Sequence, residues 1–98
     1  MIYELRTYTL SPGGAREYMR IYNAQAREVQ TGILGRLVSL MQPESGDLNQ
    51  LIFLWAFDNF EERKARRATL LADERFTEFR KAVKGLLIRQ ESQLLSAI

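Results

Sequence analysis

The stretch that decides the fold is Gln50–Phe57, which reads Q-L-I-F-L-W-A-F. A strand with one face in water alternates apolar and polar side chains. In this stretch one face would carry Leu51, Phe53, Trp55 and Phe57, and the other face Ile52, Leu54 and Ala56. Both faces of the sheet must therefore be covered at this strand, because soluble proteins rarely leave large apolar patches in water.

Two other segments carry a strand pattern. Ile2–Leu10 is dense in β-branched and aromatic residues. In residues 34–42, one face of the strand would carry Leu34, Arg36, Val38 and Leu40, and the other Gly35, Leu37, Ser39 and Met41. The turn formers at residues 43–47 join the second of these to the apolar strand as a hairpin. The last segment, residues 87–95, could continue a helix or form a fourth strand, and its local pattern leaves both open.

A long helix is predicted between the first two strands. Residues 15–30 place apolar side chains at the 3.6-residue spacing of one helix face. We expect Ser11 and Pro12 to begin this helix, as a capping residue and a first helical residue. We expect Gly32 to end it in a left-handed turn.

Two more helices are predicted after the apolar strand. Asn59 and Glu62 have the spacing of a capping box, which starts a helix that runs to about Leu71. Asp73 is placed to cap a further helix. The basic residues of the first of these helices, Arg63, Lys64, Arg66 and Arg67, are expected to form a solvated face with ion pairs such as Glu62 with Arg66.

This order of elements predicts one α+β domain over residues 1–98 with a ferredoxin-like split βαβ arrangement. Its four-stranded antiparallel sheet would have helices on one face only. We expect a second copy of the chain to cover the other face, which would make the protein a homodimer with the dimeric α+β barrel fold. The sequence does not assign which face meets the partner, because both faces are apolar.

Composition excludes several kinds of site. The chain has no cysteine and no histidine, so a thiolate nucleophile, a thiolate metal site and a Ser-His-Asp arrangement within one chain are all excluded. Acidic residues do not cluster with the spacing of metal ligands, and no glycine-rich phosphate loop is present. We therefore predict no metal and no cofactor. The absence of cysteine fits a reducing compartment, and we expect a cytoplasmic protein.

Charge and hydropathy limit the partners. The 98 residues include 14 basic and 12 acidic ones, for a net charge of +2, so no nucleic-acid partner is expected. No segment approaches the ~20 apolar residues that a transmembrane helix needs, so no membrane partner is expected. The N-terminus also lacks the basic and apolar regions of a signal peptide.

Three separated blocks resemble one known family in the expected order. The start M-I-Y-E-L-R-T-Y-T-L-S-P-G (residues 1–13), the segment L-W-A-F-D-N-F-E-E-R (54–63) and the segment Q-E-S-Q-L-L (90–95) are similar to blocks of NIPSNAP-family proteins. The resemblance implies a dimeric α+β barrel and supports a strand over the third block. One departure is Phe53, where family members often carry a histidine.

The resemblance also bears on activity. Families that share the implied fold include cofactor-free monooxygenases, haem-degrading oxygenases and a lactone isomerase, but NIPSNAP proteins have no generally established reaction. If the chain is an enzyme, the resemblance implies a cofactor-independent monooxygenase-like or isomerase-like one. The family's helix arginine corresponds to Arg63, which could simply tie its helix to a neighbouring carboxylate.

Glu4, Arg6 and Tyr8 form the most suggestive set of candidate site residues. Their alternate spacing puts a carboxylate, a guanidinium and a phenol on one face of the first strand. In a cavity, Arg6 could bind a carboxylate or an oxyanion, Glu4 could orient Arg6 or take a proton, and Tyr8 could donate a hydrogen bond. The alternative is a structural ion pair with a satisfied tyrosine. Arg36, expected on a neighbouring strand, could complete either arrangement.

Aromatic residues give the remaining candidates for ligand binding. Trp55 offers a flat surface to an aromatic ligand, although its flanking phenylalanines favour a plain core role. Tyr22, with Tyr18, lies on the apolar stripe of the first helix and could face a pocket between helix and sheet, although ordinary packing is favoured. The sequence thus leaves two hypotheses: a protein that binds or turns over a small molecule, or a non-catalytic dimerisation and interaction module.

Overall fold

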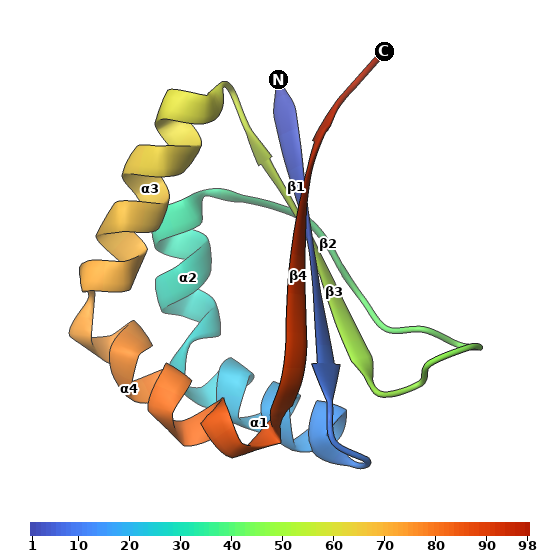
Figure 1. Cartoon of the computed structure of the whole chain (residues 1–98). Helices are drawn as coiled ribbons and strands as arrows, with labels where there is room; N and C mark the ends of the chain where they lie inside the picture. Colours follow the sequence, from blue (N-terminus) through green and yellow to red (C-terminus); the bar gives the residue numbers. More distant parts are fainter.

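The computed structural model describes all residues, Met1–Ile98. The elements follow in the order β1 (Ile2–Leu10), α1 (Gly14–Gln25), α2 (Arg27–Leu34), β2 (Arg36–Met41), β3 (Gln50–Phe57), α3 (Phe60–Ala72), α4 (Glu74–Val83), a 3-10 turn (Lys84–Leu86) and β4 (Leu87–Ser96). The strands form one antiparallel sheet in the order β2-β3-β1-β4. All helices lie on one face of this sheet (Figure 1), which confirms the ferredoxin-like α+β prediction. No helix is long and apolar enough to cross a membrane.

The two faces of β3 have different surroundings. Leu51, Phe53, Trp55 and Phe57 are at most 2% exposed and pack into the core under the helices. Ile52 and Leu54 alternate with these core residues, so they lie on the opposite face of the sheet, and they are only half-buried. The structure therefore shows that the face with Leu54 is the open one, which the apolar pattern of the strand could not decide.

The register between β1 and β3 shows which residues of β1 lie on the helix-covered face and which lie on the open face. Glu4 is opposite Trp55 and Arg6 is opposite Phe53, so the polar residues of β1 share the helix-covered face. A polar set enclosed between a sheet and its helices must satisfy its charges within the protein or with a ligand.

The predicted first helix is divided into two at Ala26. The backbone at Ala26 has a φ of −129°, which ends α1 and starts α2. Hydrogen bonds of helical spacing nevertheless meet at Ala26, from its amide to the Tyr22 carbonyl and from the Gln30 amide to its carbonyl. Because the spacing of the buried side chains is kept, the apolar stripe gave no sign of the break.

The ends of the first two helices differ from the prediction. Gly13, with a φ of 78°, is the N-cap of α1, so the helix does not begin at Ser11 and Pro12. Gly32 lies inside α2, and the left-handed residue after the helix is Gly35, with a φ of 94°. The helix continues because Leu34 is still buried in the core, so β2 starts at Arg36, later than the sequence indicated.

The second half of the chain follows the sequence more closely. The Asn59 side chain accepts a hydrogen bond from the Glu62 amide at 2.8 Å and caps α3. The Asp73 side chain accepts from the Arg75 amide at 2.8 Å and caps α4. Residues 87–95, which the local pattern left open, lie in β4, which pairs with β1.

Candidate functional site

Glu4 is the centre of the polar cluster on β1. Its side chain is fully buried and accepts hydrogen bonds from three sides. Arg63 on α3 donates from Nε at 3.1 Å and from Nη2 at 3.0 Å, and Arg6 donates from Nη1 at 2.9 Å. The Ser92 hydroxyl on β4 donates at 2.6 Å. Glu4 therefore joins β1, β4 and α3, and Arg63 does tie its helix to a carboxylate, as the sequence suggested.

These contacts determine the charge state of Glu4. Burial alone would raise the pKa of the carboxyl group, but the hydrogen bonds from Arg63, Ser92 and Arg6 outweigh burial and lower the pKa to about 2. Such a carboxylate is ionised at neutral pH and is a weak proton acceptor. Of the two roles predicted for Glu4, the geometry favours the orientation of Arg6 over proton transfer.

Arg6 and Tyr8 continue from this cluster along β1. Arg6 donates from Nε to the Tyr8 hydroxyl oxygen at 2.9 Å, and its guanidinium lies 5.6 Å from the centre of the Tyr8 ring. Because the Tyr8 oxygen accepts this bond, its own proton remains available to another acceptor. Arg6 also reaches the Gln90 side chain on β4 at 3.5 Å.

A cavity of about 820 Å³ lies next to Arg6 and Tyr8, where β1 and β4 face α3 and α4. Five cationic side chains line it and no carboxylate does. The cations are Arg6, Arg67, Arg80, Lys81 and Lys84. Aromatic rings form another part of the wall, from Tyr8, Tyr18, Phe76 and Phe79. This combination suits a ligand that carries a negative charge on an apolar body.

The two aromatic candidates lie behind the wall of this cavity. Trp55 and Tyr22 are both 0% exposed and belong to the core. The Tyr22 hydroxyl donates to the Gln30 side chain at 2.5 Å, and burial raises the pKa of Tyr22 above its ordinary value. The Trp55 indole nitrogen is buried without a hydrogen-bond partner. Neither side chain lines the cavity, so the structure gives both the packing role that the sequence favoured.

Arg36 is separated from the other candidates. It lies on the edge strand β2 opposite Ala56, on the open face of the sheet, and it pairs with Asp58 at 2.6 Å. The expectation that Arg36 is on the strand next to β1 is wrong, because β3 lies between the two strands. Arg36 therefore does not complete the set of Glu4, Arg6 and Tyr8.

Arg67 and Gln90 are two of the cavity residues that the sequence analysis did not identify as site candidates. Arg67 was assigned to a solvated helix face, but it is half-buried and lines the cavity. Burial and the nearby charge of Arg6 lower the pKa of its guanidinium from the usual value, although an arginine stays protonated. A signal was available in the sequence. Arg67 follows Arg63 by four residues, so both lie on the helix face turned to the sheet.

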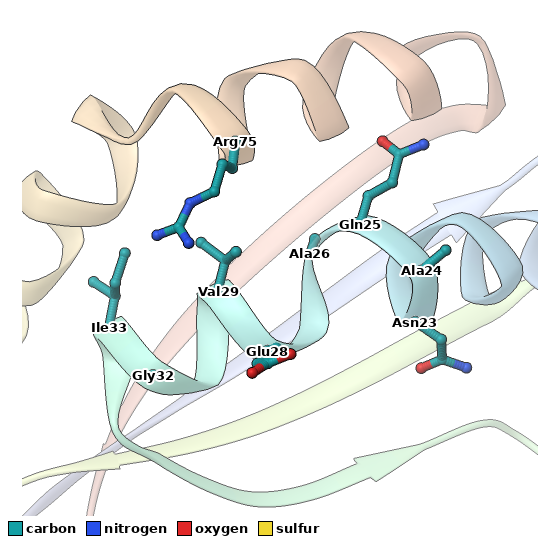
Figure 2. Close-up of a pocket in the computed structure, with 9 residues that line it drawn as sticks. All are labelled: Asn23, Ala24, Gln25, Ala26, Glu28, Val29, Gly32, Ile33 and Arg75. Carbon is teal, nitrogen blue, oxygen red and sulfur yellow. The ribbon is translucent and has the colours of Figure 1, made fainter.

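A second hollow lies on the helical side of the molecule. It has a volume of about 550 Å³ and is lined by residues of α1 and α2 together with Arg75. Figure 2 shows the Arg75 side chain extending from α4 toward Val29 of α2. Arg75 is paired with Asp73, and none of the predicted site residues lines this hollow. No group of three or more acidic side chains is arranged to hold a metal ion.

Known structures with clear sequence similarity share this fold over the whole chain. Protein Atu4242 from Agrobacterium tumefaciens is 33% identical, with a TM-score of 0.96 over 100% of this chain and 94% of that chain. An uncharacterized NIPSNAP-like domain protein from Burkholderia xenovorans is 35% identical, with a TM-score of 0.95 over 99% of this chain and 84% of that chain.

More distant similarity extends to a protein with a named activity. The crystal structure of an antibiotic biosynthesis monooxygenase has a TM-score of 0.69 at 12% identity, over 100% of this chain and 99% of that chain, which shows a shared fold. No protein of curated function matches the chain significantly. The family model of NIPSNAP matches residues 3–98. Together with the two relatives above 30% identity, this match shows that the chain belongs to the NIPSNAP family.

Proposed function

We propose that this protein is a homodimer that binds a small aromatic or carboxylate molecule in the cavity beside Arg6 and Tyr8, without a cofactor. The observation that carries the proposal is the cavity itself, whose volume of about 820 Å³ is within the usual range for ligand pockets. It lies between the sheet and the helices, and its wall combines rings with cations. A cytoplasmic location is part of the same proposal.

The network behind the cavity supports a preformed site. Glu4 fixes Arg6 from one side, and Arg6 in turn donates to Tyr8. A ligand would therefore meet side chains whose positions are already set, which reduces the entropy lost on binding. The Arg6 guanidinium already has a counterion in the fully buried Glu4 carboxylate, which holds it in place at the cavity wall.

If the bound molecule reacts, Tyr8 is the group placed to transfer a proton. Its oxygen accepts from Arg6, which leaves its O–H free to donate to a developing oxyanion. The chain has no histidine or cysteine to act as a base or nucleophile, so the substrate would have to supply its own reactivity. The neighbour at 12% identity is named as a monooxygenase, and a reaction of that kind here is part of the proposal.

Native mass spectrometry with a panel of small aromatic acids tests the binding proposal. We expect a dimer that takes up at least one acid per subunit. Gln90→Trp should fill the cavity from β4, where Gln90 is exposed on the strand but lines the cavity, and should abolish uptake. The control Lys64→Trp, on the exposed side of α3, should bind normally. Equal uptake by the Gln90→Trp variant, or none by the parent, would remove the proposal.

The alternative function is a non-catalytic dimerisation module, and the open face of the sheet favours it. That face has no helices, and five of its apolar side chains are half-buried or exposed. They are Leu5, Met41, Ile52, Leu54 and Leu95. A dimer that binds no member of the panel would support this alternative.

A further inference from the structure

The arginines around the cavity differ in whether they already have a counterion. Arg63 and Arg6 share the Glu4 carboxylate, at 3.0 Å and 2.9 Å. Arg66 pairs with Glu62 at 2.9 Å and also donates to the Ile33 carbonyl. These three guanidiniums are therefore occupied within the fold.

Arg67 has no such partner. None of the ion pairs of the chain includes it, and no hydrogen bond from its guanidinium is formed, although it is half-buried and lines the cavity. Holding a partly buried cation next to other cations without a counterion is unfavourable. A leucine or glutamine at this position would avoid that cost, so the arrangement is suited to an anion that arrives from outside.

The rest of the wall indicates what would be attached to the anion. Phe76 on α4 lines the cavity with Phe79 packed against it in the core, and Tyr18 lines the cavity with a hydroxyl group that makes no hydrogen bond within the fold. Arg80 and Lys84 at α4 and its end are exposed and add positive charge that would attract an anion toward the cavity. Among the cavity cations without a partner, Arg67 is the only half-buried one, because Arg80 and Lys84 are exposed. One half-buried guanidinium beside aromatic side chains matches one carboxylate on an apolar body.

We propose that Arg67 is the receptor for the carboxylate of the bound molecule, and that the aromatic body of this molecule packs against Phe76, which Phe79 supports from the core. The inference rests on the proposed function, because it names the ligand class and the recognition residue of the same cavity. Arg67 donates two parallel hydrogen bonds to the carboxylate, and Tyr18 or Tyr8 completes the contact from the other side. Arg6 stays paired with Glu4 and shapes the wall.

The test compares 1-naphthoate with the uncharged 1-naphthamide, two probes of nearly the same shape, by isothermal titration calorimetry on the dimer. Four proteins are used: the parent, Arg67→Gln, Arg67→Lys and Lys64→Gln. Lys64→Gln is the matched control, because it removes one positive charge from the exposed side of the same helix. Circular dichroism and thermal unfolding check that each of the four proteins is folded. Without ligand, the Arg67→Gln variant should be at least as stable as the parent, because the substitution removes an uncompensated charge.

We expect the parent to bind the acid more tightly than the amide by about 10- to 100-fold, the usual worth of a hydrogen bond to a charged group. Arg67→Gln should lose this preference and bind both probes like the amide, Arg67→Lys should keep part of it, and Lys64→Gln should match the parent. Equal binding of acid and amide by the parent, or an equal loss in Arg67→Gln and Lys64→Gln, would overturn the role of Arg67 while binding itself stands. Absence of binding of both probes would overturn the inference and count against the proposed function as well.

Discussion

Glu4 is the residue on which most of the polar cluster depends. Glu4→Gln keeps the shape of the side chain but removes the charge that Arg6 and Arg63 share. Removing one partner of a buried ion pair leaves the others uncompensated, so we expect the free energy of unfolding to fall by about 3 kcal/mol in urea denaturation. Glu91→Gln is the control, because Glu91 is exposed and pairs only with Arg89; it should cost well under about 1 kcal/mol. A similarly small cost for Glu4→Gln would contradict the role of Glu4 in joining β1, β4 and α3.

The same carboxylate makes stability depend on pH. The pKa of Glu4 is about 2 in the fold and 4.5 for the free group, so the folded state favours the ionised form. Its contribution is therefore complete above about pH 4.5 and is lost as the pH falls toward 2. We expect the free energy of unfolding to decrease across this window, and the decrease to be smaller in Glu4→Gln. Parallel pH curves for the two proteins would show that Glu4 is not the group responsible.

The two-residue alternation of strands predicted the positions of candidate site residues better than the spacing of residues on helices did. Placing Glu4, Arg6 and Tyr8 on one strand face needed only the two-residue period of a strand, and the structure confirms that shared face. Arg67 was missed because a run of charges on a helix reads as solvated unless the neighbouring layer is known. The position of Arg36 depended on strand order, which spacing along the chain does not contain.

The turn between α2 and β2 gives the clearest prediction at the scale of an element. Gly35 has a φ of 94°, and an added Cβ would lie 3.1 Å from the Arg66 guanidinium. Gly35→Ala should therefore lower the free energy of unfolding by about 1–3 kcal/mol. Gly32→Ala should raise it by about 0.5–1 kcal/mol, because Gly32 is inside the helix with nothing within 4 Å of an added Cβ. Urea denaturation should therefore show a loss of stability for Gly35→Ala and a gain for Gly32→Ala, as expected if the helix ends at Gly35 and not at Gly32. A gain for Gly35→Ala with a loss for Gly32→Ala would contradict this position of the turn.

The elements themselves were largely readable from the sequence, and their ends were less so. The cap of α3 was predicted because Asn59 and Glu62 act within one turn of helix, a purely local interaction. The division at Ala26 was not predicted, because the hydrogen bonds on either side of Ala26 keep the helical spacing of the buried side chains. The identity of β4 depended on pairing with β1, about 80 residues earlier, which no local pattern reports.

At the scale of the whole molecule, the open face of the sheet predicts a second copy. Leu54 lies on that face and is half-buried in the single chain. Leu54→Glu should place a charge in the dimer interface and shift the protein to monomers, as measured by analytical ultracentrifugation. Phe60→Glu is the control, because Phe60 is 54% exposed at the start of α3, outside that face. A monomeric parent, or a Leu54→Glu variant that still dimerises, would contradict this account.

We expect a small anionic molecule to bind between the sheet and α4. An NMR titration of the isotope-labelled protein with 1-naphthoate is the decisive test, because each backbone amide reports its own surroundings. We predict that the largest shift changes cluster around Arg67, Phe76, Phe79 and Gln90, which line the cavity from three elements. Shift changes centred on the hollow beside Val29 and Arg75 (Figure 2), or on the open face of the sheet, would contradict the claim, as would no change at all.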